Sequence, residues 1–388
     1  MIKVIKLNRV RAIFVSIDKR NENHESFYFQ HLIMKKLTLL LSLLTGLILC
    51  VNGQMKISKN SFQQANQPID TTDMTNNFYD NTETYQLPVK ELTIEGEVAN
   101  PGKVDFAKLK LHSEIVKEAL LDSSGGDRFV GAYRYDGYSL FDILNNTILK
   151  KANSSEFNPI IDLYVEIENG SGEKVVFSWG EIYYPVNLNK ILIATSVARI
   201  VPSKTKDLWP LPGSSKIIAA SDLVTERNIS NPVKITVKSV KKSFTVSRGM
   251  SPMIAPDMKL YDGEKQCGDI TASFVGENVT YNTIFYGRGR GIHSTSPFTG
   301  SILKDVIGKY YPVTAQRLKS GMFCLVGMDG YRSAVSYSEL FNRNDQQEFM
   351  LIKSAPGEDG GLFRIFSAAD FFSDRAVKSV CGIYLLGN

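Results

Sequence analysis

Histidine, tryptophan and cysteine are scarce in this chain: its 388 residues include four histidines, two tryptophans and four cysteines. Only His112 and His293 lie beyond residue 53, so the sequence gives little support to haem ligation or to a metal site built from several histidines. A Gly-x-Ser-x-Gly sequence, which marks the nucleophile of α/β-hydrolases, is also absent. We therefore assign no catalytic and no metal-ligating residue from the sequence.

Cysteine usage argues against a disulfide framework. Three cysteines lie beyond residue 53, namely Cys267, Cys324 and Cys381; their number is odd and their spacing fits no metal motif. Cys324 and Cys381 lie in apolar segments, where a thiol is typically a small buried side chain. We expect that role for both, with a disulfide between them as the alternative that an oxidising compartment would permit.

An excess of charge of either sign is absent once the N-terminal segment is set aside. Residues 1–53 contain eight basic and three acidic residues, so the remaining chain has 45 − 8 = 37 basic and 40 − 3 = 37 acidic residues. A net charge of zero does not indicate nucleic acid or an anionic membrane as a partner. We expect a small anionic ligand or a protein partner instead, because of the glycine- and arginine-containing loop at 286–297.

One apolar run, residues 37–49, follows Lys35 and Lys36 and ends near small residues at 51–53. A basic start, an apolar stretch of this length and small residues at the end are typical of a secretory signal peptide, and thirteen residues are short for a bilayer span. We predict an exported protein, periplasmic or extracellular, that starts at Met34. Residues 1–53 are then a mis-assigned extension plus the signal, and no transmembrane anchor remains after cleavage.

The rest of the chain divides into a tether and two halves. Leu49, which is not a small residue, precedes Cys50, so lipidation at Cys50 is the less favoured alternative. Residues 54–85 are rich in polar side chains and too poor in aliphatic ones to form a core, which predicts a disordered polar tether. The remaining length exceeds a usual single domain, and we predict two domains, at 86–240 and 241–388.

One sequence pattern occurs once in each half. Residues 135–144 (YDGYSLFDIL) and 298–307 (FTGSILKDVI) share an aromatic residue, a glycine two positions later, then Leu-x-Asp and two aliphatic residues. Leu140, Ile143 and Leu144 are spaced as one apolar face of a helix, and Ser139 precedes Asp142 as in a capping box. Each copy therefore predicts a turn that leads into a short helix.

The segments after the two copies also correspond, over roughly 110 residues in each half. Each half continues with an alternating strand, a hairpin turn, a second strand, a short apolar strand, an Asp-x-x-x-x-Arg sequence and a closing apolar strand. Asn-Gly and Asp-Gly suit hairpin turns because they tolerate positive φ. In the first half these segments are 163–167, 169–170, 175–179, 191–194, 222–227 and 233–237; in the second they are 323–326, 329–330, 334–337, 349–352, 370–375 and 377–385.

These motifs resemble the oxidoreductase molybdopterin-binding domain, the family with the sulfite-oxidase-like fold. The family opens with a strand and Gly-x-Val-x-Asn-Pro-Gly, continues with an aromatic-x-Gly-x-x-Leu-x-Asp turn and helix, and closes with further strands. The matching segments here are 92–102, 135–144, 298–307, 329–331, 360–365 and 377–380. The resemblance implies an α+β, strand-rich fold with two tandem sulfite-oxidase-like, molybdopterin-binding-like domains.

The chain departs from this family at the metal ligand. Active members hold molybdenum through a cysteine thiolate just before the aromatic-x-Gly turn, but residues 121–135 offer only Ser123 and Ser124. A serine hydroxyl is a poor substitute because its pKa lies far above that of a thiol, which is the softer ligand. No cysteine lies between Cys267 and Cys324 in the second half either. The resemblance therefore implies a scaffold with no cofactor bound, and molybdopterin is the alternative.

The loop at 286–297 (YGRGRGIHSTSP) contains the strongest candidates for ligand-binding residues. Alternating glycines let backbone N–H groups approach an anion, and Arg288 and Arg290 would add charged contacts, with His293 beside them. Arg332 and Arg364 join these candidates through the resemblance alone. The alternative interpretation of residues 286–297 is a flexible basic surface loop.

The sequence thus predicts an exported binding module that takes a small anionic ligand or a protein partner. An active molybdopterin-dependent oxidoreductase with an unusual metal ligand set is the alternative function.

Overall fold

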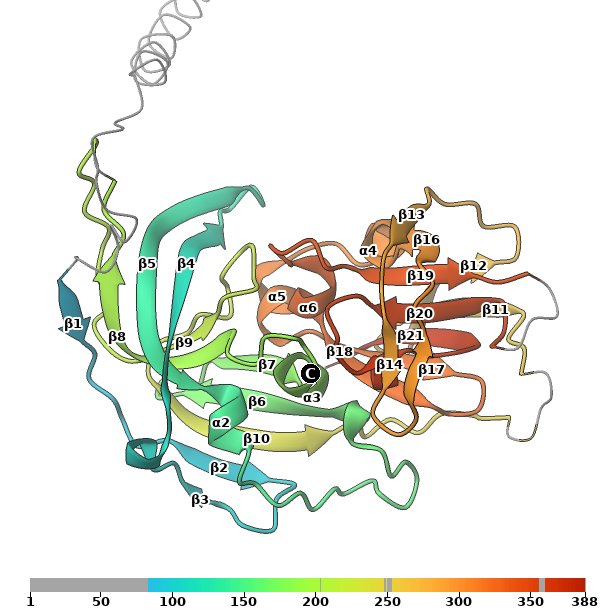
Figure 1. Ribbon diagram of the computed structural model, residues 1–388, viewed down its shortest axis with the longest axis horizontal. Coiled ribbons are helices and arrows are strands. Elements are labelled where there is room, and N and C mark those ends of the chain that lie inside the picture. Colours follow the sequence, from blue (N-terminus) through green and yellow to red (C-terminus); the bar gives the residue numbers. More distant parts are fainter. Residues whose placement is uncertain (1–82, 203, 248, 250–252, 356–359, 388) are drawn as a thin grey trace, which may run out of the picture. The chain divides into compact units, whose positions relative to one another are not determined.

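Strands make up 44% and helices 13% of the residues that the computed structural model describes, which are 83–202, 204–247, 249, 253–355 and 360–387 (Figure 1). The predicted signal peptide, its start at Met34 and Cys50 lie outside these residues, as does most of the predicted tether. The end of that tether is a strand, because Thr84 and Tyr85 pair with Ala198 and Val197. No helix in the described part of the chain is long and apolar enough to cross a membrane.

The described residues of the first half form ten strands in two sheets, with the orders β1-β8-β5-β4, where β9 also pairs with β8, and β3-β2-β10-β6-β7. Their bounds are β1 (Thr84–Gln86), β2 (Thr93–Gly96), β3 (Gly102–Lys103), β4 (Leu111–Leu121), β5 (Asp127–Ser139), β6 (Leu163–Asn169), β7 (Lys174–Ser178), β8 (Ile191–Arg199), β9 (Lys216–Ala219) and β10 (Pro232–Ser239).

The second half contains two further sheets, with the orders β12-β11-β21-β17-β18 and β13-β16-β19-β20, and a separate hairpin β14-β15. The bounds are β11 (Asp257–Asp262), β12 (Lys265–Thr271), β13 (Val279–Tyr281), β14 (Phe285–Gly287), β15 (Gly291–Ser294), β16 (Phe298–Ile302), β17 (Met322–Gly327), β18 (Arg332–Ser336), β19 (Phe349–Lys353), β20 (Phe363–Ser367) and β21 (Val380–Leu386).

The helices are single turns or little more. The α-helices are α2 (Leu140–Leu144), α3 (Trp179–Tyr183), α4 (Leu303–Ile307), α5 (Ala315–Ser320) and α6 (Tyr337–Phe341). The 3-10 helices are η1 (Phe106–Lys108), η2 (Ile160–Asp162), η3 (Gly308–Tyr310) and η4 (Ser373–Arg375). The helices predicted after both copies of the repeated motif are present as α2 and α4, and Ser139 accepts a hydrogen bond from the backbone N–H of Asp142.

The sheets of the two halves have the same strand order. In β3-β2-β10-β6-β7 and β12-β11-β21-β17-β18, the strands correspond one by one, and the second and third strands are parallel in both. The orders β4-β5-β8-β9 and β13-β16-β19-β20 correspond in the same way. The hairpins predicted at 163–179 and 323–337 are β6-β7 and β17-β18.

The predicted fold class is wrong. The four small sheets follow one another in a ring like that of a β-propeller (Figure 1), and they do not form two tandem sulfite-oxidase-like α+β domains. The motifs behind that prediction specify a strand that turns into a helix of five residues. Such a corner is a local arrangement, so it does not determine how the sheets are placed around it.

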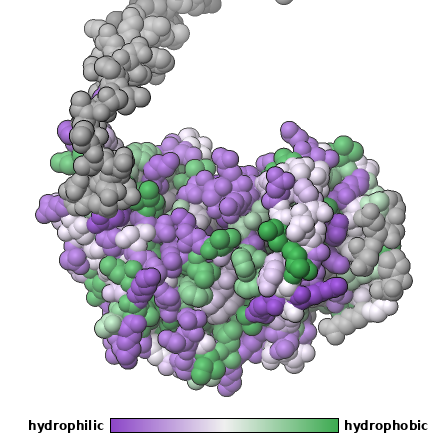
Figure 2. All heavy atoms as spheres, in the orientation of Figure 1, coloured by the Kyte–Doolittle hydropathy of each residue, from purple (hydrophilic) through white to green (hydrophobic). Residues whose placement is uncertain are grey.

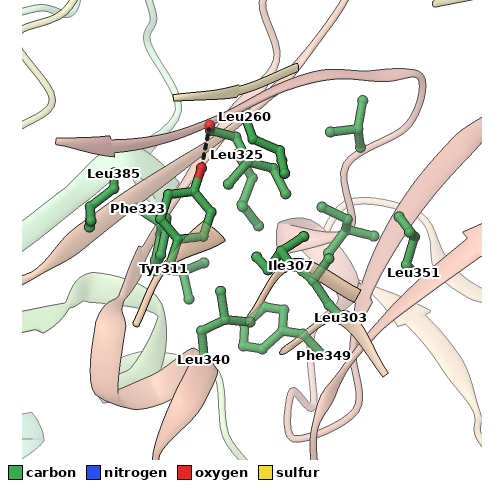
Figure 3. Packing of buried hydrophobic residues seen from close by; sticks show 14 of the residues in the cluster. Leu260, Leu303, Ile307, Tyr311, Phe323, Leu325, Leu340, Phe349, Leu351 and Leu385 are labelled. Carbon is green, nitrogen blue, oxygen red and sulfur yellow. Dashed lines mark hydrogen bonds between the residues drawn. The ribbon is translucent and has the colours of Figure 1, made fainter. Parts of the chain in front are cut away.

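The cores lie between the sheets of each half. In the second half, Leu303 and Ile307 of α4 point into a cluster with Phe349 and Leu351 (Figure 3), and all four are almost completely buried. In the first half, Leu140 and Leu144 of α2 occupy the corresponding position in a second cluster. The apolar face predicted for the repeated motif therefore packs into the core in both halves.

A buried charge cluster joins the two halves. Arg227 pairs with Asp222 at 2.6 Å and with Glu181 at 3.0 Å, and Arg375 pairs with Asp370 at 2.7 Å and with Glu339 at 2.5 Å. The Asp-x-x-x-x-Arg sequence of each half thus closes on itself and on a glutamate of the preceding helix. Two guanidinium groups hold four acidic side chains away from solvent, which is favourable only while every partner is in place.

Hydrogen bonds from the charge cluster also link the two halves. Arg227 donates from Nη1 to Oγ of Ser336 at 3.1 Å, and Arg375 donates from Nη1 to Oγ of Ser178 at 3.3 Å. Ser178 in turn donates to Oε2 of Glu339 at 2.7 Å. Each serine is also the N-cap of a helix, α3 or α6. The arginine of each half is therefore fixed in part by the other half.

Gly180 in α3 provides the space that Arg375 occupies. A Cβ at this position would overlap Cδ and Nε of Arg375, a side chain that the cluster fixes. Replacing Gly180 by alanine is therefore expected to lower the free energy of unfolding by about 1–3 kcal/mol, although alanine is the better helix former by roughly 1 kcal/mol.

Urea denaturation of the original protein and of the Gly180→Ala protein would measure this difference in the free energy of unfolding. Gly213→Ala is the matched control, because a Cβ at Gly213 meets no atom within 4 Å. Equal stability of the Gly180→Ala protein and the Gly213→Ala protein would show that Arg375 can move aside.

Candidate functional site

An apolar cavity of about 250 Å³ lies beside the β14-β15 hairpin, and we call it the hairpin pocket. The cavity exceeds the roughly 150 Å³ of an apolar site that holds benzene, so it has room for one ring or a short aliphatic chain. Its lining residues are Met253, Phe285, Phe298, Asp329, Tyr331, Ile352, Arg364, Ile365, Phe366, Ala376, Val377 and Lys378.

The hairpin places one of these residues at the pocket. Its turn runs through Arg288, Gly289 and Arg290 to Gly291, whose φ of +81° suits glycine. Side chains alternate along a strand, so Phe285 lines the pocket while its neighbour Tyr286 contacts other aromatic residues outside it. The hairpin thus covers the pocket with one face only.

Three phenylalanines form the apolar wall of the hairpin pocket. The ring centroids of Phe298 and Phe366 lie 4.8 Å apart, and Phe285 lies 5.5 Å from Phe298 and 6.1 Å from Phe366. All three pairs meet edge to face, an arrangement that aromatic rings prefer. The rings come from β14, β16 and β20, so three separate strands hold the wall in shape.

The charged groups of the hairpin pocket are Arg364, Lys378 and Asp329. Nε of Arg364 is buried and has no hydrogen-bond partner among the described residues. Gly360, with φ of +104°, leaves room for this side chain, since a Cβ there would come within 3.0 Å of Cδ of Arg364. Asp329 already accepts a hydrogen bond from the backbone N–H of Tyr331 at 2.9 Å. A guanidinium group with an unused buried N–H favours an anionic ligand group at this wall.

Tyr331 closes the polar side of the hairpin pocket. Its hydroxyl donates to the backbone carbonyl of Asp374 at 2.5 Å. Burial raises the pKa of Tyr331 well above its ordinary value of 10, with Asp374 adding to the effect. The phenol therefore stays protonated at neutral pH and serves as a fixed wall.

The structure gathers few of the residues that the sequence predicted as a site. Arg364 lines the hairpin pocket. Arg288, Arg290 and His293 are exposed on the hairpin and do not line the pocket. The backbone N–H of Arg288 donates a hydrogen bond to Asp374 at 3.1 Å, and the ring centroid of His293 lies 5.2 Å from that of Phe285.

Arg332 lies among ion pairs with the first half and does not line the hairpin pocket. It is buried on β18 and pairs with Asp162 at 3.0 Å and with Glu156 at 2.6 Å, both from the first half. Its guanidinium also lies over the ring of Phe157, 4.9 Å from the centroid. These contacts leave Arg332 as a second ionic link between the halves.

Sequence reasoning missed Phe285, Phe366 and Lys378, and it assigned Phe298 only to the repeated motif. A signal was present, since the second half has the sequence Phe-Arg-Ile-Phe at 363–366, whose alternation directs Arg364 and Phe366 to one face of a strand. The contribution of Phe285 depends on how the hairpin folds back, which no local pattern specifies.

The residues present do not fit a molybdopterin metal centre. Cys324 is buried in β17, and burial raises the pKa of its thiol, which opposes the thiolate that a metal ligand requires. Cys267, Cys324 and Cys381 are all free, so the alternative of a Cys324–Cys381 disulfide is wrong. In the part of the chain that the structure describes, no group of three or more His, Cys, Asp or Glu side chains could hold a metal ion.

A larger cavity of about 760 Å³ lies between the two halves. Four of the five lysines that line it already have partners: Lys238 pairs with Glu166, Lys242 with Glu264 and Lys319 with Glu173 at 2.7–2.8 Å, and Lys174 pairs with Glu166 at 2.9 Å, whereas no ion pair of Lys241 is described. A ligand would have to compete with these carboxylates. The hairpin pocket, with an unused buried N–H, is the better candidate site.

No protein-family model matches this chain, and no curated protein shows detectable sequence similarity to it.

Proposed function

We propose that this protein binds a small amphipathic acid in the hairpin pocket, with no chemistry performed on it. The ligand would place a ring or a short aliphatic chain against Phe285, Phe298 and Phe366, and a carboxylate against Arg364. The observation that carries this proposal is the buried, unpartnered Nε of Arg364 beside an apolar wall. An apolar cavity with a few convergent polar groups is the usual form of a small-molecule site.

The charge balance of the pocket supports an anion over a cation. Nε of Arg364 has no hydrogen-bond partner among the described residues, whereas the carboxylate of Asp329 is already used by its own loop. A charge-assisted hydrogen bond contributes about 1.5–3 kcal/mol, enough to distinguish an acid from its neutral amide. Export remains part of the proposal, and it rests on the signal-like pattern at residues 35–53.

The test compares acids with their amides in the purified chain from residue 54. Phenylacetate and hexanoate are expected to raise the melting temperature, because a ligand that binds only the folded protein stabilises it by about 2.7 kcal/mol at a hundredfold excess over Kd. Phenylacetamide and hexanamide are expected to bind about tenfold more weakly or worse, from the lost ionic contact.

Two variants and a control separate the parts of the pocket. Arg364→Met is expected to remove the preference for the acids, and Phe298→Ala to weaken acids and amides alike. Arg290→Met should leave both unchanged, because Arg290 does not line the pocket. Equal binding of acids and amides by the original protein would refute the proposal, as would an unchanged preference in Arg364→Met.

A further inference from the structure

The outer surface around the hairpin exposes several large apolar side chains. Ile284 is 65% exposed, Ile292 55%, Phe371 52% and Tyr286 38%. Figure 2 shows hydrophobic residues next to strongly hydrophilic ones at the place that β14 occupies in Figure 1. We call Ile284, Tyr286, Ile292, Phe371, Arg288 and Arg290 the hairpin face.

The hairpin face is continuous. Tyr286 lies opposite Ile292 in the hairpin, and its ring centroid is 5.7 Å from that of Phe371. Phe371 in turn packs edge to face against Phe372, 4.9 Å away. Its backbone N–H donates to the carbonyl of Tyr184, which fixes this segment to the first half. Contiguous exposed apolar surface of this kind typically marks an interaction site.

The hairpin face is also basic. Arg288 and Arg290 are exposed, and neither side chain forms an ion pair with a described residue. The nearby carboxylate of Asp374 accepts a hydrogen bond from the backbone N–H of Arg288. Aromatic and arginine side chains carry much of the binding energy in protein interfaces, and this surface combines both.

We propose that the hairpin face docks an acidic segment of another protein that carries an aromatic or aliphatic anchor. Charge complementarity favours this occupant, since carboxylates would reach Arg288 and Arg290 while the anchor packs on Tyr286 and Phe371. A symmetric contact with a second copy would bring like charges together and is disfavoured. This inference goes beyond the hairpin pocket, because the two sites use opposite faces of the same hairpin.

The test uses two synthetic peptides of the same length, one alternating glutamate with phenylalanine and leucine, the other with lysine in place of glutamate. Fluorescence anisotropy on the full chain is expected to show at least about tenfold tighter binding of the acidic peptide. Arg288→Glu/Arg290→Glu should remove the preference for the acidic peptide. Phe371→Ser should weaken the binding of both peptides and leave the acidic one preferred. Glu264→Gln, at an exposed ion pair outside the hairpin face and the hairpin pocket, should have no effect on the peptides.

Circular dichroism of each variant checks that the fold is intact, and Arg288→Gln/Arg290→Gln provides a milder second pair should charge reversal disturb the hairpin. Equal affinity for both peptides would overturn the proposal. So would an unchanged preference in both arginine pairs. Concentration-dependent dimerisation that Phe371→Ser abolishes, or arginine-dependent binding to phosphatidylglycerol vesicles with no peptide preference, would assign the face to a second copy or to lipid and equally overturn it.

Discussion

Replacing Arg375 by methionine is expected to lower the free energy of unfolding by about 3–5 kcal/mol. Methionine fills much of the space but leaves Asp370 and Glu339 buried without their cation. Arg375 is fully buried, and its ion pairs to these two carboxylates are 2.7 and 2.5 Å long. Removing one partner of a buried pair leaves an uncompensated charge, which destabilises far more than the intact pair stabilises.

Urea denaturation followed by circular dichroism measures this difference, with Arg290→Met as the control at an exposed arginine. If Arg375→Met prevents folding altogether, Arg375→Lys provides a graded variant that keeps the charge and loses the forked geometry. A loss from Arg375→Met no larger than that from Arg290→Met would show that the charge cluster does not hold the halves together.

Raising the pH from 4.5 to about 8 is expected to destabilise the protein, through the same charge cluster. Burial raises the pKa of Glu181 from 4.5 to about 7, against the opposing effect of Arg227. Burial likewise raises the pKa of Asp222 and of Asp370. Between pH 4.5 and 7 the folded protein therefore retains a proton on Glu181 that the unfolded chain releases.

The sign follows from linkage. A raised folded pKa contributes stability that is fully present below the unfolded pKa and is lost as the pH rises through the folded pKa. For Glu181 the interval from 4.5 to about 7 corresponds to roughly 3 kcal/mol. Carboxyl groups with a lowered pKa, such as Asp105, Asp122 and Glu156, titrate below this interval and do not cancel the effect.

Urea denaturation at pH 5, 6, 7 and 8 tests this expectation, because the midpoint should fall at each step. Glu181→Gln should flatten the dependence, since glutamine cannot titrate, whereas Glu264→Gln at an exposed ion pair should not. A midpoint that rises from pH 5 to 8 in the original protein would contradict the assigned pKa direction.

The sequence predicted local structure well because local structure depends on near neighbours. Asn169-Gly170 and Asp329-Gly330 mark real hairpins, and the spacing of Leu140, Ile143 and Leu144 marks a real helix. The arrangement of the sheets was not predictable in the same way. It depends on contacts such as Arg375 with Ser178, residues that are 197 positions apart.

The candidate site was predicted in part for the same reason. Arg364 lies in the strand whose alternation the sequence shows, and it reaches the hairpin pocket. Arg332 was grouped with it through a resemblance, yet its environment is set by Asp162 and Glu156, which lie far back in the chain. Phe285 lines the pocket only because the hairpin folds over β20, and this packing has no signature in the sequence around it.

The serines at the two helix starts have a consequence for how this chain can change over time. Ser178 and Ser336 each complete the anchorage of an arginine in the opposite half. A substitution of either serine removes a contact of the arginine in the opposite half, so a change in one half limits which changes the other half can tolerate.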